Sequence, residues 1–313
     1  MELGMRAAAL SIALATVAAC GGGGGAGGGG GGTPSAIEVP FTSFAAIAPN
    51  QTVVMDGGAL TATGNQTIAP NGDYTITSVN GDGIGPVTVR LSYDGAATPA
   101  LRQINISSTG VSPSLAFDRD TPGQSIACSG TFCFAQNATG SALAIDPVAA
   151  GWNYQTLGVW TLDVTPTSWV LGAVSVGAAT IGNSLPTTGT AVFNGLAVGA
   201  YLDSGGTPFA TMAGMRANVD FSTRDIQFST SNTTMVNSNT TVQSTNNGLN
   251  LSGTLSYAQG VNAFSGALQT ANGQLTGQGN GRFYGPSAQE VGGVYSLSGT
   301  GVSRMVGGFG GKR

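Results

Sequence analysis

The sequence predicts an all-β protein that ends in a small, soluble antiparallel β-barrel, and three observations support this prediction. From about residue 186 onward, apolar and polar residues alternate, as they do in strands with one buried and one solvated face. Asn-Gly pairs such as Asn272-Gly273, a strong hairpin signal, separate such runs. Between residues 37 and 179 no stretch keeps a helical period over ten or more residues.

The alternation in the second half of the chain assigns one face of each strand to the barrel interior. Glycine recurs on that face, where it leaves room for large neighbours and helps a sheet to bend and close. Residues 229–248 are rich in Ser, Thr and Asn, so we expect either a long exposed loop or a strand with a loose connection. The residues expected on the inner face are Met215, Ala217, Val219, Phe221, Leu249, Leu251, Gly253, Leu255, Tyr257, Leu275, Gly277, Gly279, Gly281, Phe283, Gly285, Tyr295, Leu297, Gly299, Met305, Gly307 and Phe309.

The first half of the chain has shorter alternating runs, separated by turn residues. Examples are residues 51–55, 74–78, 87–93 and 103–107. Four aromatic residues gather near the end of this half, and we expect them to pack a core, the alternative being a ligand platform: Trp152, Tyr154, Trp160 and Trp169.

The N-terminus has the pattern of a secretory signal over residues 1–19. Arg6 supplies a positive charge, and the largely apolar stretch of 13 residues at 7–19 is too short for a membrane span, which takes about 20. Residues 17–20 (VAAC) resemble the lipobox of bacterial lipoproteins, which implies that Cys20 is lipidated, palmitate being one of the acyl groups expected there, and becomes the first mature residue. The alternative is a secreted protein cleaved at an ordinary Ala-x-Ala site.

A glycine-rich segment follows the lipobox, so residues 20–36 are expected to form a lipidated Cys and a tether. Residues 21–32 are all glycine except Ala26. Such a segment cannot pack a core and spans about 20 Å as a flexible chain. The second mature position, Gly21, is not the Asp associated with inner-membrane retention, which favours the outer membrane.

The remaining two cysteines, Cys128 and Cys133, flank a Ser-Gly turn dipeptide. In an exported protein an even pair across a short hairpin predicts a disulfide. The alternative is a redox or metal pair, but the spacing is a poor match to C-x-x-C, and the sequence has no histidine to complete a metal site.

Composition excludes several classes of function. The chain has 10 basic and 14 acidic residues, a net charge of −4 and no basic stripe, which argues against a nucleic-acid partner. The absence of histidine excludes His-dependent triads and the usual zinc sites. Asp118 and Asp120 could hold calcium, but a solvated turn is the simpler interpretation. We therefore expect no enzyme, no cofactor and no metal.

The C-terminal sequence carries a more specific pattern. It consists of GRFYGPSAQE (residues 281–290), VGGVY (291–295) and the ending GGFGGKR (307–313). This pattern resembles the C-terminal barrel of transferrin-binding protein B and its relatives, and residues 153–160, 185–191 and 219–221 show further similarity. The motif residues are Gly281, Phe283, Tyr284, Gly285, Pro286, Glu290, Gly292 and Gly293.

The resemblance implies a fold and a role. It implies one lobe, made of a β-rich handle domain over residues 37–185 and an eight-stranded antiparallel β-barrel over residues 186–313. It further implies export to the cell surface through an outer-membrane translocon. We therefore expect a lipid-anchored, non-enzymatic outer-membrane protein that binds a protein or solute ligand in iron or nutrient acquisition. The alternative is a structural or adhesive envelope lipoprotein without a small ligand.

The motif residues are expected to act structurally. Gly285-Pro286 should turn the chain between two strands, and Phe283 and Tyr284 should fill the barrel and its rim. Glu290 is expected to pair or hydrogen-bond with Arg282 across the turn, because a buried carboxylate needs a partner. A catalytic Glu290 is the alternative. No ligand contact of the family can be transferred to a particular residue.

Overall fold

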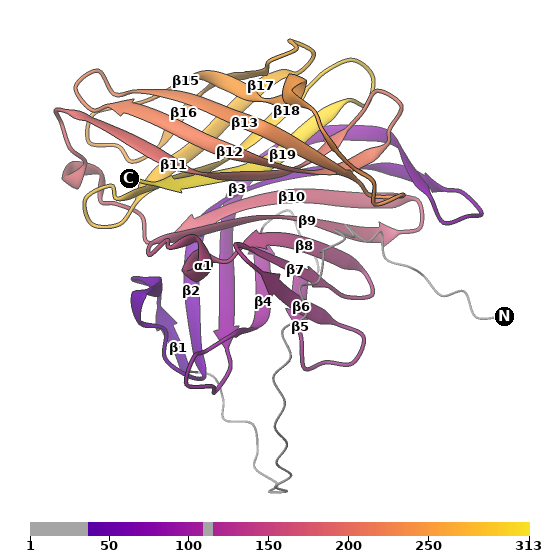
Figure 1. The fold of residues 1–313 in the computed structure, drawn as a ribbon, viewed down its shortest axis with the longest axis horizontal. Coiled ribbons are helices and arrows are strands. Elements are labelled where there is room, and N and C mark those ends of the chain that lie inside the picture. The colour runs from indigo at the N-terminus through magenta and orange to yellow at the C-terminus, as the bar shows by residue number, and fades with distance from the viewer. Residues whose placement is uncertain (1–36, 109–114) are drawn as a thin grey trace, which may run out of the picture.

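The computed structural model describes residues 37–108 and 115–313, and nearly all of its regular structure is β-strand (Figure 1). The strands form two sheets, which we name the handle (β1–β10) and the barrel (β11–β19). The signal sequence, Cys20 and the tether lie outside the described residues. Within the described residues, none of the helices has the length and apolar character needed to cross a membrane.

The handle is a ten-stranded sheet in the order β5-β4-β3-β2-β10-β9-β8-β7-β6, with β1 added in parallel beside β2. The edge strands β5 and β6 approach each other, so the sheet curls into a nearly closed barrel. The strands are β1 (Ile37–Pro40), β2 (Gln51–Ile68), β3 (Tyr74–Tyr93), β4 (Leu101–Ser108), β5 (Leu115–Asp118), β6 (Ser125–Ser129), β7 (Phe132–Gln136), β8 (Gly140–Ile145), β9 (Gln155–Thr165) and β10 (Ser168–Gly177); the helix α1 (Pro147–Ala150) joins β8 to β9.

The second sheet closes on itself through pairing of β12 with β13, which gives an antiparallel barrel of eight strands with β14 attached outside the ring. The fold is therefore the one predicted from the sequence. The strands are β11 (Thr190–Leu202), β12 (Pro208–Asp220), β13 (Asp225–Asn237), β14 (Gln243–Thr245), β15 (Leu251–Tyr257), β16 (Phe264–Thr270), β17 (Thr276–Tyr284), β18 (Glu290–Ser298) and β19 (Arg304–Lys312).

Three apolar clusters hold the molecule together. One fills the barrel, a second lines the concave side of the handle, and the third lies between handle and barrel, where β9 and β10 pack beneath β18 and β19 (Figure 1). Trp160 is buried in the handle, and Trp152 and Trp169 are buried in the cluster between the two units. These three tryptophans therefore pack cores, as expected.

The barrel interior agrees with the alternation. Met215, Leu255, Phe283 and Phe309 all belong to the barrel cluster. The Ser/Thr/Asn-rich segment is not one long loop, because β13 continues to Asn237 and β14 follows after a short connection. Its second interpretation, a strand with a loose connection, is the one observed.

Candidate functional site at the handle–barrel interface

The period of two along a strand divides the motif residues of β17 and β18 between two faces. One set points into the barrel and the other set points at the handle. The inward set contains Gly281, Phe283, Val291 and Gly293, and the outward set contains Arg282, Tyr284, Glu290 and Gly292.

The inward set builds the barrel core around Phe283, which is fully buried. Its ring lies 5.4 Å from the ring of Tyr257 and 5.5 Å from that of Phe264, both in edge-to-face geometry. A Cβ on Gly281 would lie 2.5 Å from Phe264. Glycine is therefore needed here so that the aromatic side chains can fill the interior.

The outward set meets Gln155, the first residue of β9, which is completely buried. Its side-chain amide donates to the carbonyl of Val291 at 2.8 Å and to that of Gly311 at 3.1 Å. A Cβ on Gly292 would lie 2.0 Å from the Gln155 Oε1 atom. The two adjacent glycines thus make room on opposite faces of β18. Gly292 leaves space for Gln155 of the handle, and Gly293 leaves space for the ring of Phe309 inside the barrel.

Glu290 is buried, but its partner is not the one expected. Its two carboxylate oxygens accept hydrogen bonds from the backbone N–H groups of Asn153 at 2.6 Å and Tyr154 at 3.0 Å. Among the described residues it forms no ion pair with Arg282. The prediction of a Glu290–Arg282 pair was therefore wrong, because the register of the hairpin places Tyr284 opposite Glu290 and Arg282 opposite Gly292, two pairs further along the strands.

Burial raises the pKa of Glu290, while the backbone hydrogen bonds and the charge of Lys312 act in the opposite direction. Both carboxylate oxygens are engaged by the handle, so the group has no free oxygen directed at a substrate. It fastens the β18 strand to the segment before β9, and the catalytic alternative has no geometric support.

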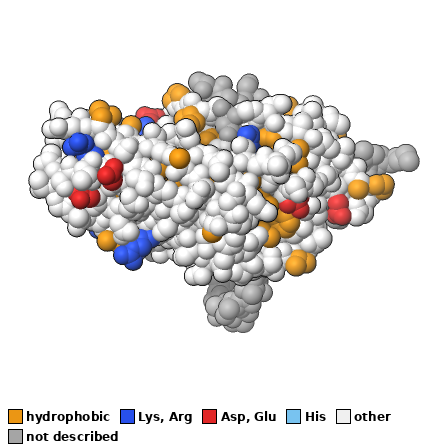
Figure 2. Space-filling model, turned by 90° about the horizontal axis from the view of Figure 1, so that it is seen from above, with side chains coloured by type: hydrophobic (Ala, Val, Ile, Leu, Met, Phe, Trp, Pro, Cys, Tyr) orange, Lys and Arg blue, Asp and Glu red, His pale blue; other side chains and the backbone are white. Residues whose placement is uncertain are grey.

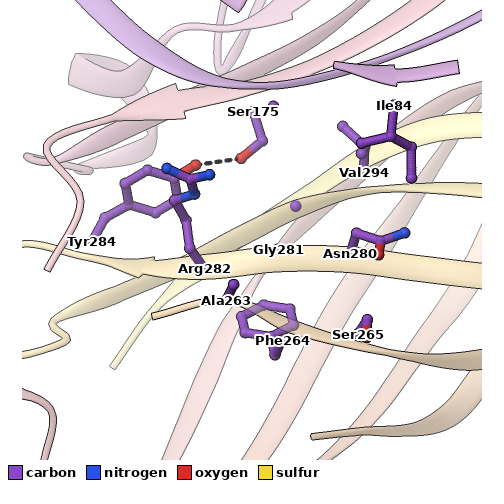
Figure 3. Close-up of a pocket in the computed structure, with 12 residues that line it drawn as sticks. Ile84, Ser175, Ala263, Phe264, Ser265, Asn280, Gly281, Arg282, Tyr284 and Val294 are labelled. Carbon is purple, nitrogen blue, oxygen red and sulfur yellow. Dashed lines mark hydrogen bonds between the residues drawn. The ribbon is translucent and has the colours of Figure 1, made fainter. Parts of the chain in front are cut away.

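Tyr284 also departs from expectation. It does not fill the barrel or its rim but lies outside, where its hydroxyl shares a 2.9 Å hydrogen bond with Ser175 of β10 (Figure 3). Burial raises the pKa of the Tyr284 hydroxyl, which keeps it protonated. The prediction for Tyr284 was wrong because alternation shows only that a strand has two faces. It does not show that the outer face is covered by the handle, whose strands are remote in sequence.

The Gly285-Pro286 turn follows Tyr284 directly. Gly285 has a φ of +86°, a conformation that L-residues with a Cβ rarely adopt, and its N–H donates to Ala178 at 2.8 Å. The Thr180 hydroxyl donates to the Gly285 carbonyl at 2.5 Å. The turn expected from the sequence is thus present, and the handle–barrel connection holds it in place.

A pocket of about 220 Å³ opens beside this interface (Figure 3). The barrel contributes Asn280 and Arg282 of β17, and the handle contributes Ile84, whose side chain is 58% exposed. The Nδ2 atom of Asn280 is buried without a hydrogen-bond partner. The pocket therefore offers one guanidinium, one amide, serine and tyrosine hydroxyls and an apolar wall, which together can hold a polar ligand.

Cys128 and Cys133 are joined by a disulfide across the β6–β7 hairpin, as predicted. Asp146 is the third member of the one three-residue group with metal-ligand spacing in the described part of the chain, but the sulfurs of that group form the disulfide. Asp118 and Asp120 lie in a hydrogen-bonded turn in which Asp120 faces Arg102 and Arg119, as in the solvated-turn interpretation.

The sequence did not identify Gln155 or Ser175 as part of this interface. The one signal at Gln155 was a large polar side chain at the start of a strand whose next residues are mostly apolar, QTLGVW. Ser175 carried no signal, because a serine in an alternating strand is ordinary. Both gain their importance from contacts with residues more than a hundred positions away.

Comparisons with known proteins find a family match for the barrel. The family model of the C-lobe and N-lobe beta barrels of Tf-binding protein B matches residues 185–313. No curated protein matches the sequence significantly.

Solved structures with a similar fold include a mutant of transferrin binding protein B from Haemophilus parasuis, with 10% identity, a TM-score of 0.42, and coverage of 83% of this chain and 76% of that chain. A surface lipoprotein has 10% identity, a TM-score of 0.41, and coverage of 81% and 98%. Transferrin binding protein B from Neisseria meningitidis has 12% identity, a TM-score of 0.40, and coverage of 85% and 77%. The family match over the closed barrel confirms the resemblance seen in the sequence: residues 185–313 match the beta barrels of Tf-binding protein B.

Proposed function

We propose that this protein is a lipid-anchored outer-membrane protein of the cell surface that binds a protein or solute ligand in iron or nutrient acquisition. The observation that carries the proposal is the match of residues 185–313 to the barrel family of a binding protein. The lipobox ending at Cys20 and the glycine tether support the anchor and the outward display. The division into signal (1–19), tether (20–36), handle (37–185) and barrel (186–313) belongs to the same proposal, as does export through a translocon.

The ligand contacts belong on the outside of the barrel, because aromatic side chains around Phe283 fill its interior. The pocket with Arg282 is our candidate contact surface. Charged side chains are few and scattered on the face shown in Figure 2, and Arg282 is the half-buried cation that lines the pocket. Transferrin is named for the structural relatives, and for this chain it is one protein ligand to be tested.

Protease shaving of intact cells tests the location. We expect wild-type protein to be digested while periplasmic marker proteins survive, and the Cys20→Ala variant to leave the membrane fraction. Protection of the wild type from protease would reject surface display, and a periplasmic or envelope-structural role would replace it. Unchanged membrane fractionation of Cys20→Ala would reject the anchor.

Binding of purified transferrin and of iron-carrier solutes to immobilised protein tests the role. We compare wild type, Arg282→Glu and the control Arg216→Glu, which reverses an exposed charge elsewhere on the barrel. If the Arg282 pocket is the contact, Arg282→Glu should weaken binding about tenfold and Arg216→Glu should not. Equal binding by all three proteins would reject the pocket. Adhesion of cells without retention of any ligand would favour the adhesive alternative.

A further inference from the structure

The handle contains a second cavity, of about 290 Å³, that is separate from the barrel motif. It lies inside the curl of the sheet, between β3 and β4 on one side and β8, β9 and β10 on the other. Neither the disulfide prediction nor the family resemblance gives this space a role. Its walls show what it can hold.

The two walls differ in side-chain size. Strands β3 and β4 contribute large aliphatic side chains, whereas β8 and β9 contribute Ala142, Ala144 and Gly158. Ala144 pairs with Gly158 in the ladder, so two of the smallest residues lie side by side. The space exists because these small residues face the aliphatic wall, which consists of Val89, Leu91, Ile104 and Ile106.

The cavity is open to solvent at one end. Ala144 is partly exposed although its strand pairs on both sides, with Cys133 of β7 and Gly158 of β9. Exposed residues mark the mouth, among them Thr98 in the β3–β4 connection and Val148 of α1, whose side chain is 61% exposed. A small molecule can therefore enter without unfolding of the sheet.

The polar groups around the cavity limit the chemistry of a ligand. The Thr156 hydroxyl already donates to the Ile145 carbonyl at 2.7 Å, and the Asp146 carboxylate already accepts from the N–H of Val148 at 2.9 Å. Tyr93 lines the cavity and is 7% exposed, and its hydroxyl has no protein hydrogen-bond partner among the described residues. Burial, and then the charge of Asp146, raise the pKa of Tyr93, so it remains a donor.

The charge of Asp146 further restricts which ligands the cavity can bind. Asp146 also lines the cavity, and its carboxylate would repel an anionic head group. No Lys or Arg lines the cavity to bind such a group. In size, an apolar cavity of about 150 Å³ accommodates benzene, so this one has room for on the order of ten carbon atoms.

We propose that the handle cavity binds a neutral, lipid-like molecule: an alkyl chain or small ring system of about ten carbons with one uncharged hydrogen-bond acceptor. The apolar walls hold its body, and the Tyr93 hydroxyl donates to its polar end. Ligand binding in the handle cavity requires neither display at the cell surface nor a partner of the barrel, so its test is separate from the tests of the function proposed above.

The test uses the full chain with Cys20→Ser, so that no detergent is required, and the neutral fluorescent probe N-phenyl-1-naphthylamine. We expect saturable binding of the probe, and displacement by 1-decanol at a concentration about tenfold lower than by decanoate at neutral pH. Tyr93→Phe should weaken 1-decanol about fivefold and leave the probe affinity unchanged. Equal displacement by decanoate and 1-decanol would overturn the assignment of a neutral ligand.

Filling the cavity provides the second arm. Ala144→Phe should lower probe affinity at least about tenfold, whereas the control Ala127→Phe, at an exposed position of the neighbouring hairpin outside the cavity lining, should not. Thr98→Trp obstructs the mouth without altering the core, so it serves if Ala144→Phe does not fold. Absence of saturable binding by the parent protein, or equal binding by the parent protein, Ala144→Phe and Thr98→Trp, would overturn the site.

Discussion

The Oε1 atom of Gln155 occupies the space that a Cβ on Gly292 would need, with only 2.0 Å between the two positions. Gln155 begins β9 of the handle, and Gly292 lies in β18 of the barrel. The absence of a side chain at Gly292 of the C-terminal motif therefore leaves the space that the buried Gln155 amide of the handle occupies. The junction between handle and barrel therefore contains this polar contact as well as an apolar cluster.

Gly292→Ala should destabilise the protein by about 1–3 kcal/mol, because the new methyl group displaces a buried side chain that has two hydrogen bonds. Urea unfolding measures the change. Gly58→Ala is the matched control, since a Cβ there would meet nothing within 4 Å, and its effect should stay within about 0.5 kcal/mol. Equal effects of the two substitutions would show that Gln155 relocates freely.

Glu290→Gln should change how stability depends on pH. The pKa of Glu290 is raised above its ordinary value of 4.5, mainly by burial. A group with a raised pKa contributes its stability below the unfolded-state pKa and loses it as pH rises through the folded-state pKa. The unfolding free energy of the wild type, relative to Glu290→Gln, should therefore fall as pH rises from about 4.5 toward neutrality.

Urea titrations of both proteins at several pH values measure this difference, and the other carboxylates cancel in the comparison. A relative stability that rises with pH would contradict the prediction. It would mean that the amides of Asn153 and Tyr154 and the charge of Lys312 outweigh burial.

The Tyr284–Ser175 hydrogen bond should appear as an energetic coupling between handle and barrel. A double-mutant cycle with Tyr284→Phe and Ser175→Ala is expected to give a coupling of about 0.5–1.5 kcal/mol. The control cycle combines Tyr284→Phe with Ser141→Ala, whose hydroxyl bonds to Thr161 within the handle. Coupling as small as in that control would place the two hydroxyls apart in solution.

The disulfide should make a modest contribution to stability, because the loop between Cys128 and Cys133 is short. Replacing both cysteines by serine is expected to cost about 2 kcal/mol in the chain-entropy model. Chemical unfolding measures the loss, and Cys20→Ser, outside the described residues, is the control. Mass spectrometry of unreduced protein should show the linked pair; two alkylatable thiols in the folded chain would contradict it.

The sequence by itself determined the class of fold and much of the barrel interior. Alternation with a period of two places Met215, Phe283 and Phe309 on one face, and this face became the barrel core. Turn residues and spacing were also sufficient for the hairpin disulfide, and the C-terminal motif was sufficient for the family of the barrel. These features depend on neighbours along the chain or across one hairpin, so a local pattern encodes them.

Only the tertiary structure decided what covers the outer faces. Glu290 meets Asn153, which lies 137 residues away, and no local pattern distinguishes such a partner from solvent or from the nearby Arg282. The handle cavity has the same origin, since Ala144 and Gly158 create space only when the sheet curls toward β3 and β4. A period of two identifies that a strand has two faces, but packing between remote strands decides which surface each face meets.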